Sequence, residues 1–334
     1  MIRLDANESF IALPEPLRAQ IAGVIAGSEW NRYPDPAAAR LCESFAGICG
    51  VPAECVVAGN GSDELISILF LGFLQKGDGV LLLEPDFSMY RFYAELNELN
   101  VYAIKKADDF SFDIAAIADI LSRGDVKLLI FSNPCNPTGR AIPRADALQL
   151  AEAAERGGAL IAVDEAYMEF WELRQSLLGD IARFENLIVF KTLSKAYGLA
   201  ALRCGFAVAS PRTAQIFRRA KSPYNVNALT QAAALCVIGN RAMVEENVKA
   251  IKSQKAKLCN ILNNYSRWLD QYETVTNFAL CRVPDAAPVT QFLMDSGIAV
   301  RVIGNELLRI TAGSDEEQAA LFAAIDRYYA GGRI

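Results

Sequence analysis

Seven short apolar runs, separated by longer stretches, dominate the sequence between about residues 50 and 210. They lie at 55–59, 79–83, 100–104, 127–131, 159–163, 187–190 and 204–210. Each is too short for an ordinary helix and rich in β-branched residues or leucine, as buried parallel strands are. The stretch PRADALQLAEAAERGG at 143–158 instead repeats apolar residues every third or fourth position and ends in glycines, which is typical of a helix. This alternation predicts an α/β fold with a doubly wound, mostly parallel, seven-stranded sheet.

The C-terminal third has a different pattern. Residues 230–269 predict two helices broken near Gly239 and Asn240, and strands are expected at 276–283, 297–303 and 307–313. Helical stretches precede the second of these strands and follow the third, which indicates a smaller α+β unit. The first 30 or so residues contain Pro14 and Pro16 and no clear strand, so we expect an arm that lies on another domain or subunit. The predicted division is an N-terminal arm at 1–29, a large domain at 30–225 and a small domain at 226–334.

Composition excludes several classes of function. The net charge is −6 and there is no basic block, so binding to nucleic acid is not expected. No apolar run reaches the length of a membrane span, and the N-terminus lacks an apolar signal segment. We therefore expect a cytoplasmic protein. The eight cysteines include no C-x-x-C pair and are expected to be free thiols.

The chain contains no histidine. This excludes Ser-His-Asp and Cys-His catalysis and His-ligated zinc, and no metal site is expected. Acid–base chemistry must then come from Lys, Asp, Glu, Tyr or Cys, or from a cofactor.

Polar residues follow three of the predicted strands. Asn136 lies in FSNPCNPTGR after the run 127–131, Asp164 follows 159–163, and Lys195 follows 187–190. Ligands of open α/β sheets bind at the carboxyl ends of strands, so these side chains could meet in one crevice. Each has an ordinary alternative: a turn for Asn136, a helix N-cap for Asp164 and a solvated surface amine for Lys195.

The segment VVAGNGSDELISILF reads as strand, glycine-rich turn and helix. Free N–H groups at Ser62 and Asp63 would suit an anion such as phosphate. The segment matches neither a nucleotide P-loop nor a full G-x-G-x-x-G, which argues against a doubly wound NAD-binding enzyme. Arg203 could bind the same phosphate through its planar fork. A lysine, a carboxylate, ring-oxygen ligands and a phosphate cradle together match a pyridoxal-phosphate site.

Three motifs carry a resemblance to a known family. NPCNPTG, DEAY and TLSKAYGLAALRCGF, in this order, resemble the fold-type I, class I and II, pyridoxal-phosphate-dependent aminotransferases. LDANES, RYPDP, GNGSDELI, EPDFSMY and LLRITAG are similar to the histidinol-phosphate aminotransferase branch. The resemblance covers nearly the whole chain.

The resemblance implies a role for each matching residue. Lys195 would form the internal aldimine with pyridoxal 5′-phosphate and move the proton, Asp164 would pair with the ring nitrogen, and Tyr167 and Asn136 would bind the ring hydroxyl. Phe87 would stack on the ring. The phosphate would be surrounded by Gly61, Ser62, Asp63, Thr192, Ser194 and Arg203, and by Tyr33 of a partner subunit, which implies a homodimer with shared active sites. The substrate would contact Asn7, Arg301 and Arg309.

The expected reaction is ping-pong transamination between histidinol phosphate and 2-oxoglutarate, in histidine biosynthesis. An aromatic amino-acid aminotransferase and a threonine-phosphate decarboxylase stay open as alternatives, as does a non-catalytic regulator that keeps the cofactor fold. The chain departs from the family pattern in its trimmed loop, VIGNELL at 302–308, which bears on substrate size and charge. It also has Cys135 where relatives often carry Asn, a change from which we expect little consequence.

Overall fold

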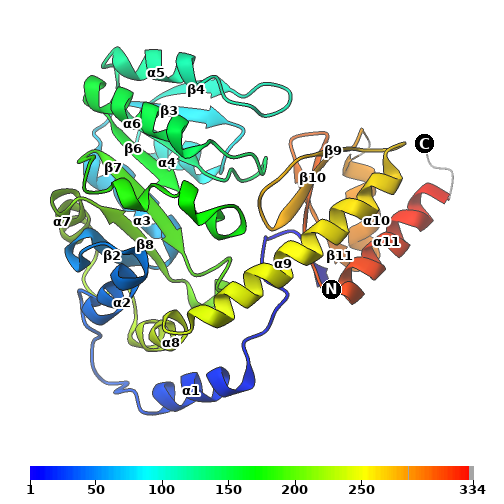
Figure 1. Cartoon of the computed structure of the whole chain (residues 1–334), viewed down its shortest axis with the longest axis horizontal. Coiled ribbons are helices and arrows are strands. Elements are labelled where there is room, and N and C mark those ends of the chain that lie inside the picture. Colours follow the sequence, from blue (N-terminus) through cyan, green and yellow to red (C-terminus); the bar gives the residue numbers. More distant parts are fainter. Residues whose placement is uncertain (285, 331–334) are drawn as a thin grey trace.

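A seven-stranded sheet forms the centre of the larger part of the molecule in the computed structural model, which describes residues 1–284 and 286–330 (Figure 1). The strand order is β2-β8-β7-β6-β5-β3-β4, and only β8 runs antiparallel to its neighbours. All seven predicted runs are strands, which confirms the α/β fold with a mostly parallel sheet. They are Val56–Gly59 (β2), Gly79–Glu84 (β3), Asn100–Lys105 (β4), Val126–Ser132 (β5), Leu160–Asp164 (β6), Leu187–Thr192 (β7) and Gly205–Ala209 (β8).

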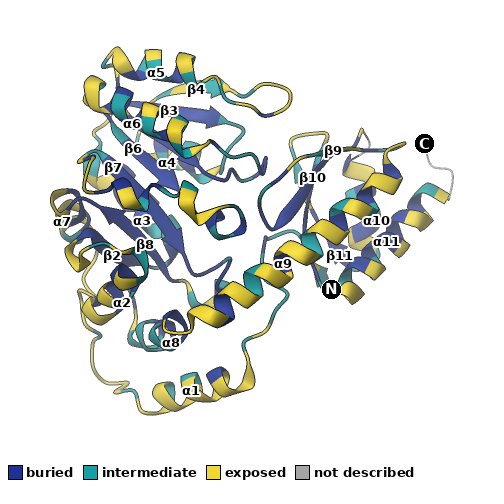
Figure 2. Ribbon diagram, viewed as in Figure 1, coloured by how far each residue is buried: buried dark blue, intermediate teal, exposed yellow. Residues whose placement is uncertain are grey.

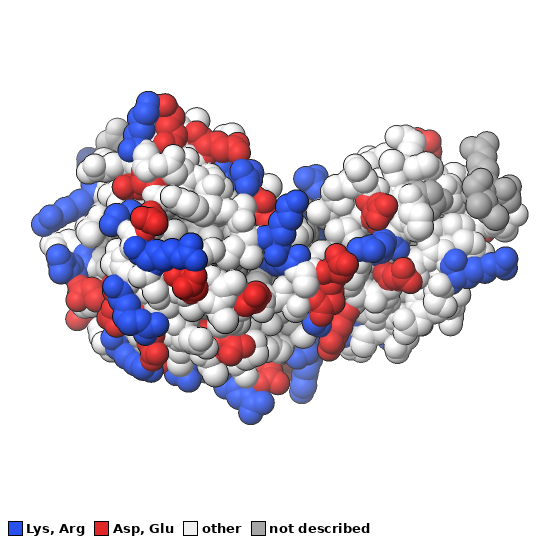
Figure 3. All heavy atoms as spheres, turned by 90° about the horizontal axis from the view of Figure 1, so that it is seen from above, with Lys and Arg blue, Asp and Glu red and all other residues white. Residues whose placement is uncertain are grey.

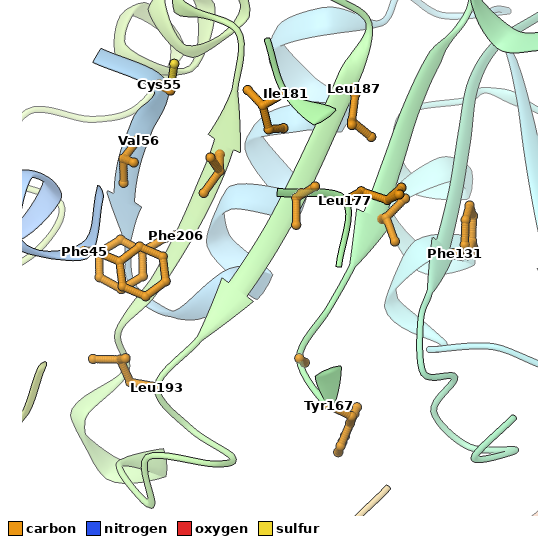
Figure 4. Packing of buried hydrophobic residues seen from close by; sticks show 14 of the residues in the cluster. Phe45, Cys55, Val56, Phe131, Tyr167, Leu177, Ile181, Leu187, Leu193 and Phe206 are labelled. Atoms are coloured by element: carbon orange, nitrogen blue, oxygen red, sulfur yellow. The ribbon is translucent and has the colours of Figure 1, made fainter. Parts of the chain in front are cut away.

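Helices cover both faces of this sheet, because the central strands are apolar on both sides. One apolar cluster packs α2, α5, α6 and α8 on one face, with Phe45 stacked 3.8 Å from Phe206 (Figure 4). A second cluster packs α3, α4 and α7 on the other. Figure 2 shows the sheet buried between these layers. The helices are Ala39–Cys49 (α2), Gly61–Phe73 (α3), Met89–Leu96 (α4), Ile114–Ser122 (α5), Arg144–Gly157 (α6), Pro211–Ala220 (α7) and Ala228–Ile238 (α8), with 3₁₀ turns at Ala53–Cys55, Met168–Phe170, Leu173–Gln175, Leu177–Asp180 and Ala200–Leu202.

The smaller part is built on a four-stranded antiparallel sheet in the order β12-β13-β10-β9. Its apolar cluster lies under α9, α10 and α11. The predicted helix break at Gly239 and Asn240 is confirmed, whereas β9 was not predicted from the sequence. The elements are Arg241–Leu262 (α9), a 3₁₀ turn at Asn263–Tyr265, Asp270–Tyr272 (β9), Phe278–Arg282 (β10), Ala286–Asp295 (α10), Arg301–Ile303 (β12), Leu307–Thr311 (β13) and Asp315–Ala330 (α11).

Helix α9 connects the two parts. Met243, Val244 and Ile251 pack into the cluster of the large sheet, while Leu258 and Leu262 pack into that of the small sheet. The apolar clusters therefore divide within α9. The division at 225/226 stays a prediction, and residues 285 and 331–334 of the predicted small domain lie outside the described residues.

The N-terminal arm lies on the smaller part first and on the larger part next. Ile2–Arg3 (β1) pairs in parallel with Ile298–Ala299 (β11), although no strand was expected in the arm. The helix Glu15–Ala26 (α1) begins after Pro14 and packs against α8. Between β1 and α1 the chain crosses from one part to the other, which places residues 5–7 beside the ends of the sheet strands.

The structure also shows the state of the thiols and the distribution of charge on the surface. All eight cysteines are free, as predicted. On the face shown in Figure 3, acidic and basic side chains are interspersed. In the described part of the chain, no helix is long and apolar enough to cross a membrane.

Candidate active site

A cavity of about 560 Å³ lies at the carboxyl ends of β5, β6 and β7, between the large sheet, the arm and the β12–β13 hairpin. All of the site residues predicted from the sequence line it except Gly61 and Tyr33. They are Asn7, Ser62, Asp63, Phe87, Asn136, Asp164, Tyr167, Thr192, Ser194, Lys195, Arg203, Arg301 and Arg309. The strand-end crevice predicted from the sequence is therefore present, and we call it the strand-end cavity.

Lys195 enters this cavity from the turn after β7. Its Nζ donates a hydrogen bond to the carbonyl of Ala6 at 2.9 Å, and lies 5.8 Å from the centre of the Tyr167 ring. Burial lowers the pKa of the amine to about 8, and the nearby charge of Arg309 contributes. A partly deprotonated amine that is buried in a cavity can act as a nucleophile and as a proton carrier, so Lys195 is not a solvated surface lysine.

Asp164 is the last residue of β6. Its carboxylate accepts hydrogen bonds from the Tyr90 hydroxyl and from the backbone N–H of Ala166, both at 3.1 Å. Burial raises its pKa to about 7. The helix-cap alternative does not hold, since the next helical turn starts at Met168 and Tyr167 is its N-cap residue. A buried carboxylate at a cavity wall would be stabilised in its ionised form by a cation brought there.

Tyr167 and Asn7 join the arm to the sheet. The Asn7 side-chain amide donates to the Tyr167 hydroxyl at 2.8 Å, and the Asn7 backbone N–H donates to Thr311 Oγ1 at 3.0 Å. Burial raises the pKa of Tyr167 to about 12. The phenol is therefore neutral near pH 7, and its own O–H is free to donate into the cavity.

Arg309 lies on β13 opposite Arg301 of β12. Its guanidinium donates to Asn136 Oδ1 and to the Asp5 carbonyl, the latter at 2.5 Å. Its Nε is buried and has no hydrogen-bond partner among the described residues. Arg301 is exposed at the cavity rim. A guanidinium with a spare buried donor and a second one nearby can bind an anionic group of a small molecule.

The first turn of α3 has the groups that could hold a second anion. Asn60, which precedes the helix, makes no side-chain capping bond to it, so the first N–H groups are left for another acceptor. Gly61 has φ +79°, and a Cβ at Gly205 would lie 2.3 Å from the backbone nitrogen of Ser62, so both positions require glycine. An Arg203 guanidinium nitrogen lies 3.4 Å from Ser194 Oγ. The Arg203 cation, the hydroxyls and the free N–H groups thus lie together at the first turn of α3, as the binding of a phosphate requires.

Tyr33 lies apart from the strand-end cavity of its own chain. It is 81% exposed, and its ring stacks on Tyr224 with centroids 4.5 Å apart. The predicted contact with a phosphate in a partner subunit stays a prediction. Phe87, in contrast, is at the cavity wall, with its ring edge-on to Tyr90 at 5.5 Å.

Sequence reasoning missed five polar residues around the cavity. Tyr90 contacts Asp164, and the walls are lined by Asp5, Asp86, Ser88 and Ser132. A signal was present for Asp86, Ser88 and Ser132, because each follows a predicted strand within a few residues. The trimmed loop at 302–308 is a tight hairpin between β12 and β13, and its residues 302–304 line the same cavity.

Comparisons with known proteins agree with this geometry. The family model "Aminotransferase class I and II" matches residues 1–325. The chain is 37% identical to a histidinol-phosphate aminotransferase of Caldanaerobacter subterraneus subsp. tengcongensis, over 97% of this chain and 92% of that one. A histidinol-phosphate aminotransferase of Clostridium kluyveri is 34% identical, over 96% and 91% of the two chains.

A solved structure is similar throughout. It is the histidinol-phosphate aminotransferase from Sinorhizobium meliloti in complex with pyridoxal-5′-phosphate, which is 26% identical, with a TM-score of 0.90 over 98% of this chain and 90% of that one. Motifs, fold and site geometry all point the same way, and the chain belongs to the class I and II aminotransferases.

Proposed function

We propose that this enzyme transfers the amino group of histidinol phosphate to 2-oxoglutarate, with pyridoxal 5′-phosphate as its cofactor. The observation that carries the proposal is the pairing, in one cavity, of a buried amine whose pKa is lowered to about 8 with a buried carboxylate whose pKa is raised to about 7. Burial is the largest cause of both pKa shifts. Perturbations of this kind are a mark of catalytic sites.

The residues of the strand-end cavity fit pyridoxal phosphate. The first turn of α3, Ser194 and Arg203 would hold the phosphate, and Asp164 would pair with the ring nitrogen. Tyr167 and Asn136 would contact the ring oxygen, while Phe87 would cover the ring. When bound, the cofactor supplies an aldehyde and a cationic ring that withdraws electrons.

The chain's own residues would then perform three tasks. Lys195 Nζ would accept the proton from the substrate Cα and return it, because its pKa near 8 lets one group serve as base and acid at neutral pH. Asp164, once paired with a cation, would stay ionised. Asn7 and the β12–β13 hairpin would close the cavity over the substrate and limit access of water.

Arg309 and Arg301 support a phosphorylated amino donor. Arg301 and Arg309 are register partners across the β12–β13 ladder, and Arg309 has a buried Nε without a partner among the described residues. This arrangement suits a phosphate at least as well as a carboxylate. An amino-acid donor would present a carboxylate to the same two residues, and O-phosphothreonine carries both groups, so the experiment below compares all three kinds of donor.

The exposed Tyr33 supports a homodimer in which each subunit would complete the phosphate site of the other. Such a large exposed aromatic ring, preorganised by its stacking on Tyr224, suits an intersubunit contact. We further propose that this dimer is cytoplasmic.

A half-reaction panel tests the function. The cofactor-loaded protein is mixed in turn with histidinol phosphate, phenylalanine, tyrosine and O-phosphothreonine, and loss of the cofactor's aldehyde absorbance is followed. We expect rapid conversion with histidinol phosphate and regeneration by 2-oxoglutarate. Faster conversion with the aromatic amino acids would replace the proposed substrate. Release of CO₂ from O-phosphothreonine would make the enzyme a decarboxylase.

A further inference from the structure

Three buried reactive groups lie in or behind the wall of the strand-end cavity, and none has a part in the chemistry described above. Lys106 follows β4, Asp86 follows β3, and Cys135 lies in the turn after β5. Lys106 Nζ is 3.7 Å from Asp86 Oδ2, 3.0 Å from Cys135 Sγ and 2.5 Å from the carbonyl of Pro85. The Lys106 and Asp86 side chains are 1% and 4% exposed. We call these three residues the Lys106 cluster.

Asp86 joins this cluster to the cavity. Its Oδ1 accepts the backbone N–H of Phe87 at 2.7 Å, and its Oδ2 accepts the backbone N–H of Ser132 at 3.2 Å. The Ser132 hydroxyl also donates to this carboxylate. One carboxylate therefore ties the end of β3 to the end of β5.

The same carboxylate orients Asn136 through Ser132. Because the Ser132 O–H donates to Asp86, its oxygen presents a lone pair on the other side. That oxygen accepts the backbone N–H of Asn136 at 2.9 Å. Phe87 and Asn136, the proposed contacts to the ring face and the ring oxygen, thus depend on one buried anion.

Lys106 is the cation of this cluster. The other groups near Asp86 are Asp164, Tyr90 and Cys135, which are neutral or anionic. Burial raises the pKa of Asp86, and the charge of Lys106 limits that rise although the net direction stays upward. Burial alone would lower the pKa of Lys106, but Cys135 and Asp86 outweigh it and the net direction is upward. The Phe112 ring covers Nζ at 4.9 Å and favours the same charge.

We propose that Lys106 is a positioning residue: its buried ammonium keeps Asp86 ionised, and Asp86 in turn holds Phe87 and Asn136 where they contact the cofactor ring. The inference rests on the proposed function. Without the ammonium, Asp86 takes up a proton and accepts fewer hydrogen bonds, so the ring contacts loosen. Among the described residues, the proposed phosphate site at α3 shares no hydrogen bond with this network, so it should keep its geometry.

The test compares Lys106→Met with the double variant Lys106→Met/Asp86→Asn. Lys105→Met is the matched control, since it makes the same change one residue earlier on an exposed side chain. Each cofactor-free protein is titrated with pyridoxal phosphate and, separately, with inorganic phosphate. The first ligand reports the ring contacts, the bond to Lys195 and the phosphate contacts together, and the second reports phosphate binding without any ring contact.

For Lys106→Met we expect pyridoxal phosphate affinity to fall by about tenfold, the scale of one lost hydrogen bond to a charged group. Phosphate affinity should match that of the parent. The double variant should recover to within about threefold of the parent, because the asparagine amide keeps an acceptor oxygen without requiring a counter-charge. Lys105→Met should bind both ligands as the parent does.

Four outcomes would overturn the inference: parent-like pyridoxal phosphate binding by Lys106→Met, a parallel loss of phosphate binding, no recovery in the double variant, or an equal loss in Lys105→Met. If Lys106→Met does not fold, the double variant alone decides, and failure to bind within the stated range rejects the proposal. A parent protein that binds phosphate but not pyridoxal phosphate would instead reject the proposed function, and this inference with it.

Discussion

The lowered pKa of Lys195 leads to a quantitative prediction about how fast the cofactor-free protein captures pyridoxal phosphate. Only the neutral amine attacks an aldehyde. With a pKa of about 8 in place of 10.5, roughly 10% of the amine is neutral at pH 7, against about 0.03% for an ordinary lysine. Capture should therefore be roughly 300-fold faster at pH 7 than by a solvated lysine with the same contacts.

The assay is a stopped-flow measurement of the absorbance change on capture, at fixed concentrations, between pH 6 and 10. We expect the rate to rise about tenfold per pH unit up to pH 7 and to level off above pH 8. Reaction with free lysine in the same buffers corrects for titration of the cofactor itself. A rate that still rises tenfold between pH 9 and 10 would refute the lowered pKa.

Removing one of its causes tests the physical origin of the shift. Burial is the largest cause, and the charge of Arg309 is the second. In Arg309→Met the midpoint of the rate profile should therefore move upward but stay below 10.5, the value of an unburied lysine. A profile identical to that of the parent would mean that Arg309 does not act on Lys195 through its charge.

Three further predictions follow from single side chains. Asp164→Asn should stabilise the cofactor-free protein above pH 7 by up to a few kcal/mol in thermal or urea unfolding, and it should abolish most transamination. In the parent, the raised native pKa of Asp164 contributes stability that is complete below pH 3.8 and lost as the pH rises through about 7. A stability difference between variant and parent that stays flat from pH 4 to 8 would contradict this prediction. Arg309→Met should raise the KM for histidinol phosphate at least tenfold, and an unaltered KM would remove Arg309 from the substrate site. Tyr33→Phe should weaken cofactor retention in dialysis, with Tyr102→Phe on exposed β4 as control, and equal retention by both variants would remove the cross-subunit contact.

The fold was predictable because its signals are local. Each strand of the large sheet is an apolar run flanked by turn residues, and its type is decided within a few positions. The two-residue strand β1 and the three-residue β9 carry no such signal. They form because a partner offers an unpaired edge: β11, distant in sequence, for β1, and β10, the next strand along the chain, for β9. Tertiary pairing, not local pattern, decides such short strands.

The candidate site was predictable in part for the same reason. Lys195, Asp164 and Asn136 each follow a strand, and the strand-end rule brings them together. The contact between Asn7 and Tyr167 spans the arm and the sheet and was not predicted, although the resemblance to the family placed both residues at the site. Tyr90 was missed because it lies on α4, and nothing in the local pattern says that its hydroxyl reaches Asp164.

The Lys106 cluster could not be predicted from the sequence by considering its residues one at a time. Cys135 was expected to matter little. Lys106 lies at the end of an edge strand, where a solvated amine is the ordinary expectation, and the sequence around Asp86 is typical of a turn. The structure buries all three within one hydrogen-bonded group. The attraction between two buried opposite charges offsets part of their loss of hydration, whereas either charge alone is strongly disfavoured. The three residues therefore have to be interpreted together. Because they are buried together next to Asn136, the cluster affects the site in a way that no one of the three residues predicts.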